Sequence, residues 1–163
     1  MVRRGHFHGY GPWIGSSKRY AQEHNRRPVH EIVPDREMDP KLYARYTDAK
    51  NEFQNGDLPP MTTAHWLLKT RSFHRSDQMW ADPEEAVIWL KGIYTENPPG
   101  EVGGKPGYLD LESKITHARE SLGLGQDVSW VYYLAGAERM VSYSVVCCPN
   151  HSHPELACPL PLG

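Results

Sequence analysis

The chain has 163 residues, of which 39% are apolar and 23% are charged. This length suits a single domain with a hydrophobic core, since a chain of about 150 residues buries roughly two-thirds of its unfolded surface. Five tryptophans, nine tyrosines and three phenylalanines exclude a collagen-like or wholly disordered chain. The 14 glycines and 14 prolines predict long irregular connections.

The formal net charge of −2 conceals an uneven distribution. Residues 1–30 carry a net charge of +5 and the rest of the chain −7, with histidine neutral. A basic segment of this kind suits nucleic acid, an anionic surface or the acidic body of another copy. The predicted partner-binding or nucleic-acid-binding residues are Arg3, Arg4, Lys18, Arg19, Arg26 and Arg27.

Composition also bears on the compartment. The longest apolar runs are four or five residues, far short of the 18 or so that a membrane span needs. The N-terminus has no hydrophobic core of a signal peptide. Three cysteines, all within the last 17 residues, do not make a disulfide framework. We therefore expect a cytoplasmic protein, or one in a particle assembled in the cytoplasm, that is neither secreted nor in a membrane.

The first part of the chain predicts an arm. Residues 1–17 hold four glycines, one proline and three aromatic residues with no periodic apolar pattern, and residues 17–27 are polar. We expect an extended basic arm over residues 1–27, with one exposed helical segment, that contributes to binding and little to the fold. A single α+β domain follows over residues 28–163. Within it, Val29–Val33 lies between two prolines, which confines it to an edge strand or an extended segment.

Two Asp-Pro pairs predict helix starts, because aspartate caps the free N–H groups and proline fits the first turn. After Asp39-Pro40, a stripe at spacings of 4, 3 and 4 predicts one helix that ends at Gly56; its members are Leu42, Tyr46, Ala49 and Phe53. After Asp82-Pro83, residues 86–94 are apolar on almost every face and predict the central helix.

A further helix is predicted to start near Asp110 and to stop at Gly123. Residues 63–74 contain Trp66 and Leu67 and fit either a helix or a strand over 64–69, of which the helix is favoured.

The C-terminal third changes to a period of two, which predicts a β-hairpin over residues 128–147. A two-residue type II′ turn at Gly136-Ala137 would set the register. One face would then be apolar, through the cross-strand pairs Val128/Val145, Trp130/Tyr143, Tyr132/Val141 and Leu134/Arg139. The predicted fold is α+β, with three or four helices on this hairpin, a third strand at 29–33 or 64–69, and a Pro-rich tail.

The tail carries the strongest chemical signal. Thiolates and imidazoles suit zinc, and tetrahedral sites gather such ligands from short loops. The hairpin register places Cys147 in the core, so the predicted zinc ligands are Cys148, His151, His153 and Cys158, which would staple residues 148–163. Three alternatives stay open: His6 and His8 as a metal-prone pair, a Cys148–Cys158 disulfide, and a solvated tail without metal.

Three classes of function follow. The favoured one is a non-catalytic binding or structural subunit of an assembly, such as a virus-particle or nucleoprotein component, whose partners are other protein subunits or copies of itself. The alternative is a small metal-dependent hydrolase or biosynthetic tailoring enzyme with a pocket at Tyr133, Ser142 and Ser144, although no paired carboxylates or base are recognisable. A nucleic-acid binder acting through the arm is the third, against which the acidic body argues.

Overall fold

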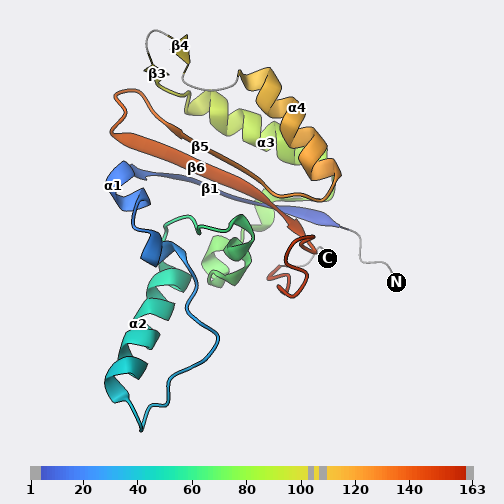
Figure 1. Ribbon diagram of the computed structural model, residues 1–163. Helices are drawn as coiled ribbons and strands as arrows, with labels where there is room; N and C mark the ends of the chain where they lie inside the picture. The colour runs from blue at the N-terminus through green and yellow to red at the C-terminus, as the bar shows by residue number, and fades with distance from the viewer. Residues whose placement is uncertain (1–4, 103–104, 107–109, 161–163) are drawn as a thin grey trace.

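The computed structural model describes residues 5–102, 105–106 and 110–160. It is a mixed α and β structure built on a four-stranded antiparallel sheet with strand order β2-β1-β6-β5. The strands are β1 (His6–Ser16), β2 (Met79–Trp80), β5 (Val128–Tyr133) and β6 (Arg139–Cys148). Helices α3 and α4 cover one face of the sheet, and the chain between β1 and β2 lies on the other side (Figure 1).

Strand β1 corrects the prediction of an arm that contributes little to the fold. His6–Ser16 pairs with β6 along its whole length and with β2 at its start, so it is an inner strand of the sheet. The pairing shifts by one residue between Tyr10 and Trp13, which is a β-bulge. Tyr10 and Trp13 are three residues apart, a spacing that would normally put them on opposite faces of the strand. The extra residue in the bulge brings them to the same face, where Tyr10 lies opposite Ser144 and Trp13 opposite Ser142. Residues 1–4 of the predicted arm lie outside the described residues.

The hairpin register is confirmed. Val128 pairs with Val145, Trp130 with Tyr143 and Tyr132 with Val141. The turn differs from the predicted type II′, because Gly136 (φ +89°) and Ala137 (φ +58°) both have positive φ, whereas type II′ requires it only at the first position. The amide of Leu134 still donates to the carbonyl of Arg139.

The apolar face of the hairpin forms the main core with two helices, α3 (Pro83–Glu96) and α4 (Leu111–Gly123). Asp82 and Asp110 cap them, each through its side-chain carboxylate on a backbone N–H of the first turn. Both starts and the end of α4 at Gly123 agree with the sequence prediction. The helical side chains buried in this core are Ala86, Val87, Leu90, Ile93, Ile115, Ala118 and Leu122.

Helix α2 (Pro40–Asn55) has the predicted limits, with Asp39 as its cap, but not the predicted packing. It does not lie on the hairpin. It projects from the opposite side of the sheet, and Phe53 is the one residue of the helix that is buried (Figure 1). Its C-terminal end is anchored by Lys69, whose ammonium donates to the carbonyl oxygens of Phe53 and Gly56 at 2.6 and 2.9 Å.

The second face of the sheet is covered by short helical turns. Residues 63–74 form neither an α-helix nor a strand but the 3₁₀ helices η2 (Thr63–Leu68) and η3 (Arg71–Phe73), followed by η4 (Ser76–Gln78). Trp66 and Leu67 of η2 pack with Tyr10 and Val146 in a second core. The third strand is therefore β1, and neither 29–33 nor 64–69 joins the sheet.

The remaining elements are small. Residues 17–27 form α1 (Ser17–Tyr20) and η1 (Glu23–Arg26), and β3 (Glu101–Val102) pairs with β4 (Lys105–Pro106). Among the residues that the structure describes, no helix combines the length and apolarity that a membrane span requires.

Candidate metal centre

The site is built where β1 and β6 meet the tail. His6 lies directly opposite Cys148 in the β1–β6 ladder, and His8 is two residues further along β1 on the same face. Phe7, between the two histidines, points to the other face and opposes Cys147 in the main core. Because side chains alternate along each strand, His6, His8 and Cys148 lie on one face of the sheet. Phe7 and Cys147 lie on the other face.

The fourth group lies on the tail, which is folded back by a polar pair of the buried Asn150 and the half-buried Asp127. Asn150 donates through Nδ2 to both carboxylate oxygens of Asp127 at 3.0 Å, and accepts from the amide of His153 at 3.0 Å. Asp127 also accepts from the amide of Cys147 at 2.8 Å. Further along, Leu156 packs against the second core. These contacts carry Cys158 back to the end of the sheet.

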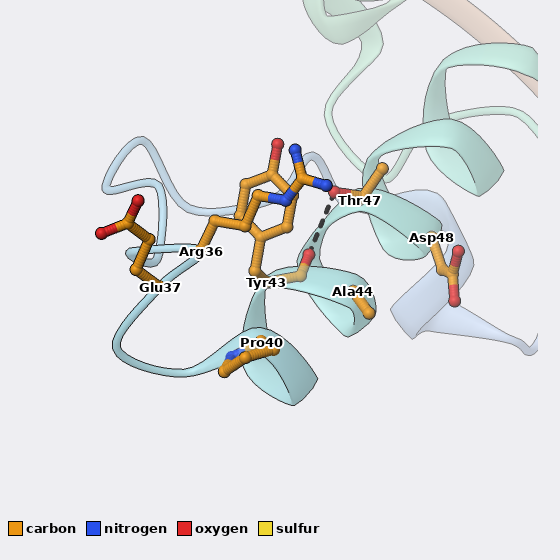
Figure 2. Close-up of a pocket in the computed structure, with 7 residues that line it drawn as sticks. All are labelled: Arg36, Glu37, Pro40, Tyr43, Ala44, Thr47 and Asp48. Atoms are coloured by element: carbon orange, nitrogen blue, oxygen red, sulfur yellow. Dashed lines mark hydrogen bonds between the residues drawn. The ribbon is translucent and has the colours of Figure 1, made fainter.

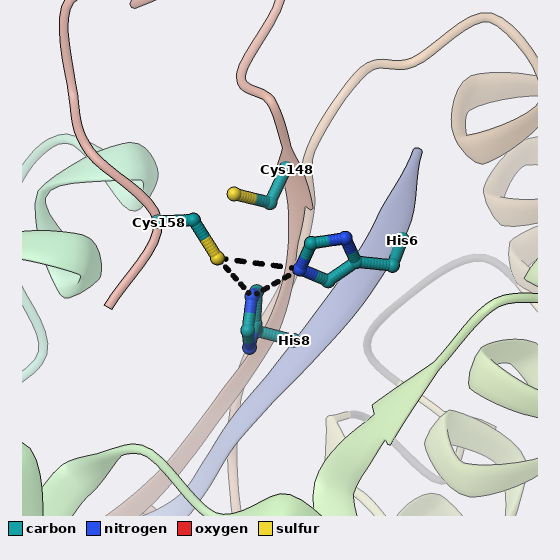
Figure 3. Close-up of side chains that lie close together, drawn as sticks. All are labelled: His6, His8, Cys148 and Cys158. Atoms are coloured by element: carbon teal, nitrogen blue, oxygen red, sulfur yellow. Dashed lines mark hydrogen bonds between the residues drawn. The ribbon is translucent and has the colours of Figure 1, made fainter. Parts of the chain in front are cut away.

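The side chains of His6, His8, Cys148 and Cys158 point toward one another (Figure 3). Their ligand atoms all lie within 4.8 Å of one another. The Nε2 atoms of the two histidines are 3.0 Å apart, and the Sγ atom of Cys158 lies 3.3 Å from His6 and 3.4 Å from His8. In a tetrahedral zinc site with Zn–N of ~2.0 Å and Zn–S of ~2.3 Å, ligand atoms lie about 3.3–3.8 Å apart. The cluster therefore has nearly the dimensions of a Cys₂His₂ zinc site.

Burial favours the neutral form of one histidine of this cluster. His6, His8 and Cys148 are buried, and Cys158 is half-buried, which leaves one open side for metal entry. Burial, assisted by the neighbouring His6 and His74, lowers the pKa of His8 to about 4. A neutral imidazole is the form that binds a metal, so His8 is available as a ligand at neutral pH.

Aromatic and histidine side chains support the cluster from behind. Tyr10 stacks near His8, with ring centroids 6.4 Å apart, and its other neighbour Trp66 stacks at 4.9 Å. The hydroxyl of Tyr10 lies 2.8 Å from Nδ1 of His74, and Nε2 of His74 donates to the carbonyl oxygen of Lys69 at 2.9 Å. Burial and the nearby thiols of Cys158 and Cys148 raise the pKa of Tyr10.

Two of the four predicted zinc ligands belong to this cluster and two do not. Cys148 and Cys158 are members, whereas His151 is exposed and His153 lies beside Glu155 and His65 instead. Their places are taken by His6 and His8, the His-x-His pair noted as an alternative. Cys147 is buried in the main core, as the register predicted. The structure records no disulfide among these three cysteines.

The basic residues of the predicted arm that the structure describes lie in different environments. Arg26 is buried: its guanidinium stacks on Tyr20 and donates to the carbonyl oxygens of Pro59 and Tyr20. Arg19 pairs with Asp57, and Arg27 pairs with Glu23. Lys18 is exposed, while Arg3 and Arg4 lie outside the described residues. The expected binding role of Arg26 is thus replaced by an internal one.

Of the three residues expected to line an enzyme's pocket on the second face of the hairpin, Tyr133 is 40% exposed and the two serines are buried. Ser142 and Ser144 are buried opposite Trp13 and Tyr10 of β1, and Ser144 shares a hydrogen bond with Ser129 at 2.9 Å.

Comparison of the chain with protein-family models, with curated proteins and with solved structures found no significant match.

Proposed function

We propose that this chain is a non-catalytic structural or binding subunit that carries a structural zinc ion on His6, His8, Cys148 and Cys158. The observation that carries the proposal is the convergence of two imidazole nitrogens and two thiol sulfurs within 4.8 Å at a largely buried site. Four protein ligands complete a tetrahedral shell and leave no position for a water or substrate. A closed shell of this kind is typical of structural zinc and not of catalytic zinc.

The position of the ligands supports a stapling role. His6 is near the start of the first strand, Cys148 ends the last strand, and Cys158 is in the tail. One ion would therefore join the two ends of the chain to the sheet. Since the ligand loop spans about 150 residues, closing it would remove much of the freedom of the unfolded chain. The metal would add to a fold that already has its own core.

The test is the zinc content of purified protein and its single variants, measured by elemental analysis. We expect about one zinc per chain in the parent protein, and loss of zinc from each of four variants: His6→Ala, His8→Ala, Cys148→Ser and Cys158→Ser. The matched controls Cys147→Ser, His151→Ala and His153→Ala should keep zinc, because these side chains lie outside the cluster. Circular dichroism would verify that each variant is folded.

The opposite pattern would overturn the proposal. Zinc that is lost from His151→Ala and His153→Ala but kept in His6→Ala would restore the ligand set expected from the tail alone. The parent protein could also contain no zinc, bind no added zinc and gain no stability from it. That result would show that the proposed zinc site is wrong.

A further inference from the structure

Helix α2 stands apart from the body of the protein. Between Pro40 and Asn55 only Phe53 is buried, and the helix projects away from the sheet (Figure 1). The loop over residues 28–39 runs back along one side of it, where Arg36 lies over the ring of Tyr43 and the two segments enclose a pocket of about 650 Å³ (Figure 2). The helix contacts the body of the protein at its C-terminal end, where Phe53 is buried and Lys69 and Thr70 donate to the carbonyl oxygens of Phe53 and Gln54.

Large hydrophobic side chains are exposed on this projection. Of the eight that the structure records among the described residues, four fall within 11 consecutive positions of the chain; they are Ile32, Val33, Met38 and Leu42. Met38 is 84% exposed and Leu42 49%. Leu42 begins a stripe that continues through half-buried Tyr46 and exposed Ala49 before Phe53 enters the body. Apolar surface concentrated in this way marks an interaction site.

The charges beside this stripe have a distinct order. Lys41, Arg45, Asp48 and Glu52 follow at spacings of 4, 3 and 4, so they form one exposed line next to the apolar stripe. The line is basic in its first half and acidic in its second. None of the four takes part in an ion pair among the described residues.

This order is unfavourable for an isolated helix. Lys41 and Arg45 repel each other across one turn, as do Asp48 and Glu52. The first turn holds no acidic residue and the last no basic one, so the charges that compensate the helix dipole come from outside the helix, from the carboxylate of the cap Asp39 and the ammonium of Lys69. By contrast, α3 places Glu84 and Glu85 in its first turn.

The same order is favourable between two antiparallel copies. The basic half of each helix then meets the acidic half of the other, and a two-fold axis repeats every such contact. The apolar stripes meet at the centre in the same arrangement. We propose that α2 is a self-association surface, on which a second copy of this chain docks its own α2 in antiparallel orientation. This gives the subunit role a partner and does not depend on the metal.

Two charge-reversed variants of the full chain test the proposal by sedimentation velocity. Lys41→Glu with Arg45→Glu makes the line wholly acidic, and Asp48→Lys with Glu52→Lys makes it wholly basic. The parent protein should form a dimer whose population rises with concentration and falls with salt. Each variant alone should show a dissociation constant raised at least about tenfold, because like charges meet across the interface. An equimolar mixture should associate again.

The matched control is Asn51→Lys, an exposed change on the side of the helix opposite the apolar stripe, which should leave association unchanged. A parent protein that is monomeric at every concentration would overturn the proposal, and so would a mixture that fails to associate or variants that dimerise like the parent. Zinc content measured on the same samples keeps this result separate from the metal proposal.

Discussion

At the scale of residues, alternation along two strands decides which side chains can reach a metal. Cys147 and Cys148 are neighbours in sequence but lie on opposite faces of β6, and Phe7 separates His6 from His8 in the same way. The hairpin register, readable from the sequence, was enough to distinguish the two cysteines. The histidines could not be placed, because nothing in the tail sequence indicates that a segment 140 residues away lies beside it.

The hairpin face can be tested at Trp130. This side chain is 5% exposed and packs edge-on against Tyr94 and Tyr143 in the main core. Trp130→Ala should lower the free energy of unfolding by about 3–5 kcal/mol, since it removes a large buried ring. Tyr133→Ala, on the opposite face and 40% exposed, is the control and should cost less than ~1 kcal/mol. Denaturant unfolding of both variants gives the comparison; equal losses would contradict the register.

His74 predicts a pH dependence. Burial lowers its pKa from the usual 6.5, while its hydrogen bond to the carbonyl of Lys69 opposes that shift. As pH falls through 6.5 the unfolded chain takes up this proton before the folded chain does, so stability is lost toward acid pH. His74→Gln cannot take up the proton. The stability advantage of the parent over this variant should therefore shrink from pH 7 to pH 5, by about 1.4 kcal/mol per unit of pKa lowering.

Denaturant unfolding of the two proteins at each pH measures that difference. Comparing them cancels the titration of groups that do not interact with His74. An advantage that stays constant or grows toward pH 5 would mean that His74 is charged in the folded protein.

At the scale of elements, caps and periodicity predicted three α-helices with their ends, because these signals are local. Asp39, Asp82 and Asp110 each cap a helix as expected. The positions of the helices depend on distant partners. Helix α2 has an apolar stripe like that of α4, yet it projects into solvent, and the stripe alone does not reveal which surface it meets.

Strand β1 was missed because its glycines suggested flexibility. In the structure they make room for tryptophan rings: a Cβ at Gly9 would lie 2.7 Å from the Trp80 ring, and one at Gly15 would overlap the Trp13 ring. A glycine inside a strand can weaken the strand, but it also occurs where another group packs closely against the backbone. The bulge after Tyr10 also breaks the strict alternation that would have revealed the strand.

The inner position of β1 predicts the effect of truncation. A chain that begins at Ser17 lacks the strand between β2 and β6 and should fail to fold, since the second face of the sheet loses Tyr10 and Trp13. A chain that begins at Gly5 keeps the strand and should retain most of the stability of the parent protein. Thermal unfolding followed by circular dichroism distinguishes them. A cooperative transition in the Ser17 chain, near that of the parent, would show that β1 is dispensable.

At the scale of the whole molecule, the first strand and the tail meet at one end of the sheet. The first strand, the last strand and the tail converge on the Cys₂His₂ cluster, while the two cores lie on either side of the sheet. The sequence predicted the class of fold and a zinc site that uses Cys148 and Cys158. It did not predict that His6 and His8 of the N-terminal strand lie beside these cysteines, so that the proposed metal would link this strand to the tail.

X-ray absorption at the zinc edge of the zinc-loaded protein tests this account most directly, because it separates sulfur from lighter ligand atoms and recognises imidazole by scattering from its outer ring atoms. We predict two sulfur ligands at ~2.3 Å and two imidazole ligands at ~2.0 Å, with a total of four ligands. In the protein with both His6→Ala and His8→Ala, this two-nitrogen, two-sulfur signature should vanish. Its persistence in that variant, or a parent protein with fewer than two imidazole ligands or more than four ligands in total, would contradict a closed structural zinc site at the junction of β1, β6 and the tail.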